Sequence, residues 1–371
     1  MASKPPPPPR RDLEEAKEIE ETFSVGKIIK DRWQVIMKLD AGGFGQIFAV
    51  SDMLINEVAA LKAEFGQPDW KCQLPIELHV MKKCQGQIHA VKLFGAGIED
   101  RCNYIVMQLL GPNLGKLRRL CPYEPKRFST NNIVRLSIQA IEALRDLHAV
   151  NTIHRDIKPT NFAMGYPGGD KKDLLYILDF GLSRCYTLAN GQLRQPRPKA
   201  GFRGTLRYCT LRSHDRQDLS RGDDLVSLFY MIYEMSAGSL PWTSTNKATS
   251  IKQMKLDTPP PILAQRMTSI HELVKIAEHI AKLGFFDKPN YEMMLNELRD
   301  AMTRLTINSG DLWDWENQYD RVATEIQNQQ EQKITATKDG PSATPTTTTT
   351  KNVAESDETD GGKPKKSKKS R

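Results

Sequence analysis

The chain has 371 residues, a formal net charge of +8 and 39% hydrophobic residues, a content that excludes a wholly disordered protein. Apolar runs such as 104–110 fall far short of the ~20 residues that span a bilayer, and no apolar signal segment follows the first residues. The six cysteines form no CxxC pair, so we expect reduced thiols. We therefore expect a cytoplasmic protein with one large or two ordinary domains and no membrane insertion.

Residues 1–32 begin with a short polar stretch and five consecutive prolines. A proline run favours polyproline II, which does not join a core, and the mixed charges that follow are compatible with a short solvated helix. A ligand for a proline-binding module is the alternative. A disordered, proline-rich and charged leader is the favoured interpretation of residues 1–32.

The elements expected in residues 33–316 change character along the chain. Runs rich in β-branched and aromatic residues predict five strands, at 33–40, 45–52, 57–64, 89–98 and 102–111. Apolar residues then recur every three to four positions over 132–150, which predicts a helix with Thr130 or Asn131 as its N-cap. The pattern after residue 215 is mostly helical. A strand-rich part at about 33–110 and a helix-rich part at about 111–316 predict two lobes with a cleft between them.

From residue 317 to 371 the chain is polar, with a low-complexity segment at 345–351 and an acidic one at 355–362. Such a composition predicts a disordered tail. Its basic end, 363–371, is typical of a nuclear-localisation or anionic-surface segment. With a pI of about 9.0, a nucleic-acid-binding protein is a rival interpretation, which no aromatic and basic RNA-binding pattern supports.

The strongest motif is HRDIKPTN at 154–161, followed by DFG at 179–181. Together they resemble the catalytic core of eukaryotic protein kinases, whose pattern is HRDLxxxxN and then DFG. The resemblance implies that Asp156 accepts the proton of the attacking hydroxyl and that Asn161 and Asp179 hold Mg²⁺. Lys158 matches the residue that contacts the transferred phosphate in serine/threonine kinases.

Upstream residues match the ATP-binding parts of the kinase pattern in the required order. Lys62 ends the run AALK, as the lysine that contacts the α- and β-phosphates does, and Glu77 stands where a helix carries its partner carboxylate. Met107 corresponds to the residue behind the adenine, and backbone groups of residues 108–110, up to Leu110, correspond to the hinge that binds the adenine edge.

The glycine-rich loop departs from the GxGxxG pattern, because residues 40–45 read DAGGFG. Asp40 replaces the first glycine and adds a negative charge, so we expect weaker binding of ATP. The resemblance still assigns contacts with ATP to Gly42, Gly43, Phe44, Gly45 and Ile47.

Two further stretches, 204–242 and 97–119, narrow the resemblance to one superfamily of protein kinases. Residues 204–242 are similar to the casein kinase 1 superfamily pattern GTxRYxSxxxH…RxDDLxSLxY…GxLPW, which here replaces the usual APE tripeptide. Residues 97–119 are closest to the tau-tubulin kinase branch of that superfamily. The resemblance implies that Asp224 is a buried aspartate that binds the catalytic-loop backbone, and that Thr205 lies beside Asp156 and Lys158.

Basic residues fill the segment 182–212, which carries seven Lys and Arg and no Asp or Glu. Guanidinium groups bind phosphate and carboxylate in bidentate fashion. We therefore expect Arg184, Arg203 and Arg207 to contact acidic or already phosphorylated substrates, and a merely solvated basic loop is the alternative. Residues 209–212 depart from the superfamily pattern, and because this stretch shapes the substrate surface, the substrate preference stays open.

The sequence thus predicts an α+β, bilobal kinase fold with a small β-rich N-lobe and a larger helical C-lobe. The expected activity is transfer of the γ-phosphoryl group of Mg-ATP to Ser or Thr of proteins, by a monomer whose substrates include cytoskeletal proteins. A catalytically weak pseudokinase scaffold is the alternative, because the glycine loop is degenerate.

Overall fold

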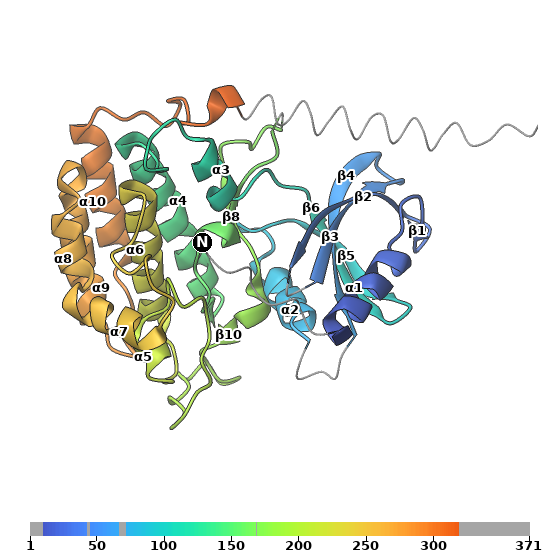
Figure 1. The fold of residues 1–371 in the computed structure, drawn as a ribbon, viewed down its shortest axis with the longest axis horizontal. Helices are drawn as coiled ribbons and strands as arrows, with labels where there is room; N and C mark the ends of the chain where they lie inside the picture. Colours follow the sequence, from blue (N-terminus) through green and yellow to red (C-terminus); the bar gives the residue numbers. More distant parts are fainter. Residues whose placement is uncertain (1–9, 43–44, 67–71, 168, 319–371) are drawn as a thin grey trace, which may run out of the picture.

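A six-stranded antiparallel sheet forms the N-lobe, with the strand order β1-β2-β3-β4-β6-β5 (Figure 1). The computed structural model describes residues 10–42, 45–66, 72–167 and 169–318. Two helices accompany the sheet, α1 (Arg10–Thr22) and α2 (Leu74–Cys84). The strands are β1 (Ile28–Ile29), β2 (Trp33–Gly42), β3 (Gly45–Asp52), β4 (Glu57–Phe65), β5 (Leu93–Glu99) and β6 (Cys102–Gln108).

The two faces of this sheet have different partners because side chains alternate along each strand. Phe48 and Leu61 point to an outer cluster that also contains buried residues of β6. Their neighbours Ile47 and Lys62 are paired in register and lie on the opposite face, toward the C-lobe. The sheet therefore separates an apolar outer layer from the cleft between the lobes.

The C-lobe is mainly helical and surrounds two short two-stranded sheets (Figure 1). Its helices are α3 (Leu114–Leu120), α4 (Thr130–Ala149), α5 (Leu211–His214), α6 (Arg221–Ala237), α7 (Ala248–Asp257), α8 (Pro260–Gln265), α9 (Glu272–Lys282) and α10 (Tyr291–Arg304). Its strands are β7 (Thr152–Ile153), β8 (Phe162–Met164), β9 (Leu175–Ile177) and β10 (Arg184–Cys185). Short 3₁₀ helices lie at Pro159–Asn161, Phe180–Leu182 and Thr268–Ile270.

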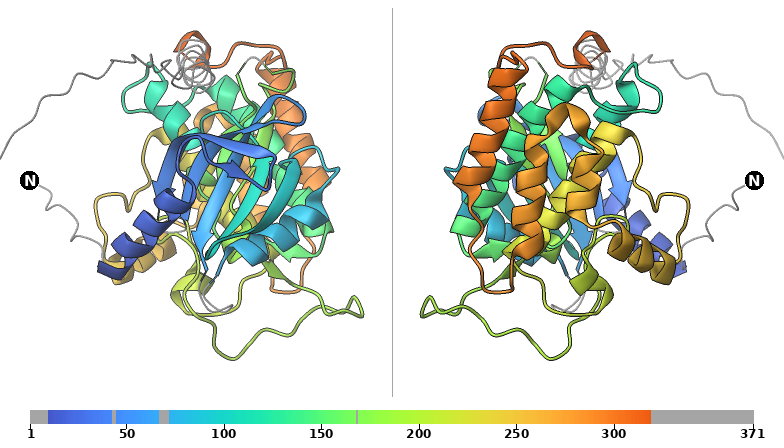
Figure 2. Two further views of the ribbon diagram at one scale, coloured as in Figure 1. Left: turned by 90° about the vertical axis from the view of Figure 1, so that its right-hand side faces the viewer. Right: turned by 90° about the vertical axis from the view of Figure 1, so that its left-hand side faces the viewer.

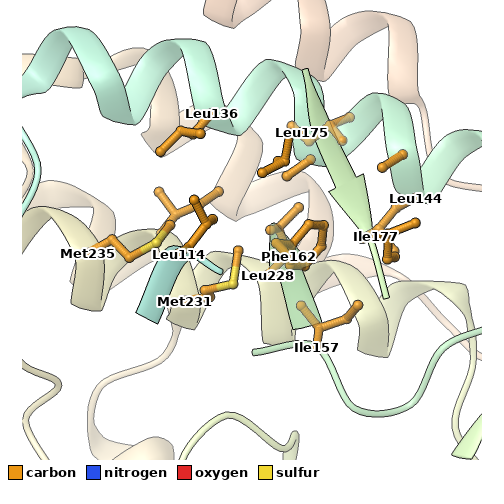
Figure 3. Close-up of a cluster of buried hydrophobic side chains, with 14 of the residues drawn as sticks. Leu114, Leu136, Leu144, Ile157, Phe162, Leu175, Ile177, Leu228, Met231 and Met235 are labelled. Atoms are coloured by element: carbon orange, nitrogen blue, oxygen red, sulfur yellow. The ribbon is translucent and has the colours of Figure 1, made fainter. Parts of the chain in front are cut away.

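The core of this lobe lies directly under the expected catalytic motifs (Figure 3). Ile157 and Phe162 are fully buried beside Leu144 of α4 and Leu228 of α6. These two apolar residues flank the segment that contains Lys158 and Asn161, so packing of the core fixes both ends of the motif. The bilobal α+β fold expected from the sequence is confirmed.

The predicted elements agree closely with the observed ones. The five strands expected in the first lobe are β2 to β6, although β5 begins at Leu93 rather than at residue 89. The helix expected over 132–150 is α4, whose N-cap is Ser129, one residue before the two candidates. Ser129 Oγ accepts the N–H of Asn132 at 3.3 Å. Over the described residues, no helix combines the length and the apolar character that crossing a membrane requires.

The leader differs from the disordered segment expected for residues 1–32. Residues 10–22 form α1, which lies on the face of the sheet away from the C-lobe (Figure 1). Ile19 and Phe23 are 4% and 1% exposed, and the Phe23 ring lies 5.6 Å from the ring of Phe48. Two apolar residues four positions apart are enough to anchor a charged helix when a sheet offers them an apolar face. Residues 1–9, and residues 319–371 of the tail expected from residue 317, lie outside the described residues.

Replacing Phe23 with alanine tests whether this packing contributes to stability. Phe23→Ala should lower the free energy of unfolding by about 3 kcal/mol, the typical cost of removing a buried aromatic ring. Urea denaturation measures it, with Val25→Ala as the control because Val25 is 60% exposed. Equal stability of the two variants would contradict the packing of α1 on the sheet.

Candidate active site

The segment 154–161 brings three of the expected residues into contact. Lys158 Nζ donates to Asp156 Oδ2 at 2.6 Å, and Thr205 Oγ1 donates to Asp156 Oδ1 at 2.8 Å. Asn161 Nδ2 donates to the carbonyl oxygen of Asp156 at 2.8 Å. Both carboxylate oxygens of Asp156 thus have a partner that fixes the side chain, and the cation of Lys158 lies beside them.

A buried carboxylate supports this segment from below. Asp224 of α6 is 1% exposed; its Oδ2 accepts the N–H of His154 at 2.7 Å and its Oδ1 accepts the N–H of Arg155 at 2.8 Å. Burial opposes the charge of Asp224, but hydrogen bonds from His148 and from this backbone hold its pKa below the ordinary value. Arg155 has a φ of 71°, a left-handed conformation that costs energy and persists only where the surroundings impose it.

The position of Asp224 is the one that the resemblance implies. His148, on α4, was not singled out in the sequence. Its Nε2 contacts Asp224 at 3.0 Å and its Nδ1 contacts the Tyr291 hydroxyl at 2.6 Å. A histidine on the apolar face of a predicted helix gives no sign of such a partner, because Asp224 lies 76 residues further along the chain.

Lys62 lies between two carboxylates from different lobes. Its Nζ donates to Glu77 Oε2 at 2.6 Å and to Asp179 Oδ1 at 3.2 Å. Burial opposes the charge of Lys62, yet Glu77 and Asp179 more than offset this cost and raise its pKa above the ordinary value. Burial also opposes the charge of Asp179, but Lys62 holds the pKa of that carboxyl below its usual range. The three side chains therefore form a charged cluster across the cleft.

The strand that carries Lys62 also positions the helix that carries Glu77. Glu64 lies two residues after Lys62 on β4, and its carboxylate accepts the N–H of Gln73 at 3.0 Å and that of Leu74 at 2.8 Å. These N–H groups belong to the first turn of α2, where a helix lacks internal acceptors and attracts negative charge. Glu64 was not singled out in the sequence, and it fixes the distance between Lys62 and Glu77.

The donor set at the base of the cleft fits a magnesium ion. Asn161 uses its amide NH₂ group on the backbone of Asp156, so its oxygen is the end that is available to a cation. Asp179 is a carboxylate held in the ionised form. It lies two residues after the end of β9 and has a φ of 63°, a left-handed conformation. Mg²⁺ prefers a few such oxygens together with phosphate and water oxygens, and among the described residues no cluster of three His, Cys, Asp or Glu offers a closed protein site.

The hairpin of β2 and β3 carries the glycine-rich loop. Gly42 and Gly45 are paired across it, and Gly45 has a φ of 116°. A Cβ atom on Gly45 would lie 2.1 Å from the carbonyl oxygen of Ala63, so no other residue fits there. Ile47 lies on the cleft face beside Lys62. Gly43 and Phe44, at the tip, lie outside the described residues.

Asp40 does not carry an unpaired charge. Its Oδ2 lies 3.4 Å from Nζ of Lys116, which belongs to α3 in the C-lobe, and its Oδ1 accepts the N–H of Ala41. The charge that was expected to disturb ATP thus faces a lysine across the opening of the cleft. The sequence gives no sign of this pair because an exposed lysine on a helix is ordinary.

The two lobes are joined after β6. Met107 is 9% exposed and is paired with Ala60 of β4. The N–H of Gln108 donates to the Lys92 carbonyl, and the N–H of Gly111 donates to the Met164 carbonyl. Among the expected hinge residues, Leu109 and Leu110 lie between these two bonds.

A cavity of about 330 Å³, which we call the arginine cavity, is lined mainly by residues of the basic segment 182–212. Five arginines surround it, and the remaining two lining residues are Cys185 and Gly201. The arginines are Arg155, Arg184, Arg194, Arg197 and Arg203.

Acidic groups neutralise only part of this cavity. Asp218 accepts from Arg197 Nε at 3.0 Å and lies 3.8 Å from Arg184. Burial together with Arg184 and Arg203 lowers the pKa of Arg155 to about 10. An anion in the cavity would relieve this repulsion.

Arg207 lies elsewhere, although the sequence grouped it with Arg184 and Arg203. Its Nη1 donates to Glu234 Oε1 at 3.0 Å, and Glu234 is 1% exposed. Glu234 also accepts the hydroxyl of Tyr208 at 2.5 Å. Arg207, whose side chain is 41% exposed, thus pairs with a buried carboxylate of the C-lobe and does not line the arginine cavity.

Comparisons with known proteins agree with this geometry. The family model described as "Protein kinase domain" matches residues 33–308. A Dictyostelium discoideum protein named as a serine/threonine-protein kinase is 37% identical over 297 residues, which are 80% of this chain and 59% of that relative. A Caenorhabditis elegans protein with the same kind of name is 32% identical over 80% of this chain and 85% of its own length.

A third relative bears on the superfamily. A Caenorhabditis elegans protein named as a casein kinase I is 36% identical over 222 residues, which are 58% of this chain and 63% of that protein. This match is partial, so the casein kinase 1 superfamily and its tau-tubulin branch stay predictions. The family model covers most of the chain and coincides with the Lys62, Asp156 and Asp179 geometry. The chain belongs to the protein kinase family.

Proposed function

We propose that the protein is a serine/threonine kinase that transfers the γ-phosphoryl group of ATP to protein hydroxyls. The observation that carries the proposal is the bond of Lys62 to both Glu77 and Asp179. Kinase activity depends on this lysine being held toward the phosphates while the DFG aspartate faces the metal. A scaffold that no longer acted on ATP would not need to keep a buried carboxylate, Glu77, and two partly buried charges together, since each costs free energy to desolvate.

The chain's own residues have separate tasks in this reaction. Asp156 orients the substrate hydroxyl and accepts its proton, while Lys158 and Thr205 hold the carboxylate in place. Lys62 binds the nucleotide phosphates, and Leu109 and Leu110 bind the adenine through their backbone. Asp179 and Asn161 would hold Mg²⁺, which supplies positive charge to the phosphate oxygens.

We also propose that the substrates carry acidic or phosphorylated side chains. The arginine cavity supports this preference, because five arginines line it and the buried carboxylate of Asp218 pairs with two of them, Arg184 and Arg197. Guanidinium–phosphate bonds are charge-assisted and bidentate. Membership of the casein kinase 1 superfamily, in its tau-tubulin branch, is part of the same proposal and rests on residues 97–119 and 204–242. Cytoskeletal substrates follow only from that branch.

Replacing the proposed base tests the enzyme against the pseudokinase alternative. Asp156→Asn keeps the size of the side chain and should lower phosphate incorporation by about 10²- to 10⁴-fold, the usual contribution of a positioned base. The assay uses γ-labelled ATP, Mg²⁺ and casein or serine-containing peptides. Equal phosphate incorporation by the variant and the natural protein would contradict the proposed kinase activity.

The pair of Asp40 and Lys116 gives a test on the nucleotide. Lys116→Met leaves the Asp40 carboxylate unpaired beside the phosphates, so KM for ATP should rise by about 2- to 5-fold, within the range of an exposed ion pair. Asp40→Gly added to that variant should return KM to the natural value. A rise of the same size in both backgrounds would show that the pair does not act on ATP binding.

The arginine cavity is tested by comparing peptides that differ in charge. Arg203→Gln should lower kcat/KM by about tenfold for a phosphorylated peptide and by less than twofold for its unphosphorylated counterpart. Arg266→Gln, an exposed arginine of the C-lobe, is the control. An equal fall of kcat/KM for both peptides in Arg203→Gln would contradict the proposed preference for anionic substrates.

A further inference from the structure

The helix α1 touches both strands of the glycine-loop hairpin. Nε2 of Gln46, on β3, donates to the carbonyl oxygen of Ala16 at 2.6 Å. Lys38, on β2, forms an ion pair with Glu20 one helical turn later. The helix α1 lies on the face of the sheet away from the C-lobe (Figure 2, left), so both contacts reach the hairpin from that side. The helix therefore holds the hairpin from the side opposite the nucleotide.

Gln46 is the stronger of the two contacts. It is 2% exposed, whereas the side chains of Lys38 and Glu20 are 36% and 52% exposed, so that pair contributes little. A buried amide is costly without a hydrogen-bond partner. The Ala16 carbonyl has two lone pairs, so it accepts this bond in addition to its helical one.

The position of Gln46 connects this bond to the nucleotide loop. Gln46 follows Gly45 directly and is paired with Ala63 of β4, while the next pair is Ile47 with Lys62. A shift of Gln46 would therefore move the end of the glycine loop relative to Lys62. Glycine-rich loops cover the phosphates through their backbone, so such a shift changes the contact with ATP.

The helix itself is fixed to the same strand. Ile19 and Phe23 belong to the outer cluster with Phe48, which lies two residues after Gln46 on the same face of β3. Phe23 also lies 6.1 Å from the ring of Tyr104 on β6. Apolar packing thus sets where the helix lies, and the Gln46 bond transmits that position to the loop.

We propose that α1 is a positioning element of the nucleotide site, which acts on the glycine loop through the bond between Gln46 and Ala16. Gln46 is a positioning residue and does not contact ATP itself. The proposal rests on the proposed kinase function and adds a segment that precedes the matched domain, residues 33–308. Removing the bond loosens the loop and weakens binding of ATP while the chemical step keeps its residues.

Gln46→Met is the first variant, because methionine has a similar size and no amide. Among the residues that the structure describes, Oε1 of Gln46 has no hydrogen-bond partner. The substitution thus removes one bonded and one unbonded polar atom. We expect the free energy of unfolding to change little, while the loop loses the bond that positions it. KM for ATP should rise by about 3- to 10-fold, with kcat and the KM of the peptide within twofold of the natural protein.

The matched control is Gln139→Met in the C-lobe. The Gln139 amide likewise bonds to the backbone, its Nε2 donating to the Asp173 carbonyl at 3.1 Å and its Oε1 accepting the Leu175 N–H at 2.8 Å. Its loss should leave KM for ATP unchanged. A rise of KM in both variants would mean that any lost amide weakens ATP binding, which overturns the proposal.

A second variant acts from the helix side. Ile19→Ala weakens the packing of α1 on the outer cluster and replaces no residue of the hairpin, and KM for ATP should rise in the same direction. In the Gln46→Met background, Ile19→Ala should have no further effect on KM, because the bond that carries the coupling is already absent. Independent, multiplying effects of the two substitutions would contradict a route through Gln46.

Direct binding of the nucleotide separates this proposal from the proposed function. Fluorescence titration of the full chain with Mg-ADP measures Kd without any substrate. Natural protein that binds tightly and Gln46→Met that binds at least threefold more weakly support the positioning role. Equal Kd values overturn it while the kinase function stands, and natural protein that binds no nucleotide overturns both.

Discussion

The arrangement of the site depends on the ion pairs that Lys62 forms with Glu77 and Asp179. Lys62 lies between Glu77 of the N-lobe and Asp179 of the C-lobe, and removal of one member of such a cluster leaves buried charge without a partner. Each member is fixed by its own support. Glu64 anchors the helix of Glu77 through two backbone bonds, and the N–H of Leu178, next to Asp179, donates to the carbonyl oxygen of Asn161. The relative position of the lobes is therefore coupled to the state of the nucleotide site.

A second constraint fixes the substrate side of the cleft. Asp224 holds the backbone of His154 and Arg155 from within the C-lobe, and the apolar residues Ile157 and Phe162 anchor the same segment in the core (Figure 3). Asp156 is thus presented by a rigid loop, while Lys62 is presented by a sheet whose outer face carries α1. The position of Asp156 therefore depends on the core of the C-lobe, and that of Lys62 depends on the outer cluster of the N-lobe sheet.

The residues that we expect to be catalytic could be located in the sequence because their signal is local. HRDIKPTN and DFG are contiguous motifs, and runs rich in β-branched and aromatic residues identified the strands that carry Lys62 and Ile47. Contacts between distant segments could not be predicted, since an exposed lysine such as Lys116 or a strand glutamate such as Glu64 has no distinctive neighbours in the sequence. The partner of Arg207 was missed for the same reason, because Glu234 lies 27 residues later inside an apolar helix.

The helix α1 shows where a composition argument fails. Charged residues dominate residues 10–22, and average composition therefore favoured disorder. A short solvated helix was compatible with these charges, and the signal for its burial is the spacing of Ile19 and Phe23, which places two apolar side chains on one helical face. Whether such a face is buried depends on the sheet, and the sheet's outer cluster is visible only in three dimensions.

The rate of γ-phosphoryl transfer with and without Lys62 tests the account most directly. The full chain is incubated with γ-labelled ATP, Mg²⁺ and a serine- and threonine-containing peptide, in parallel with Lys62→Met, and the circular dichroism of both proteins is compared. The account predicts labelled phosphoserine or phosphothreonine from the natural protein and a rate at least about 100-fold lower from the folded variant. Equal rates, or no transfer by the natural protein, would contradict it.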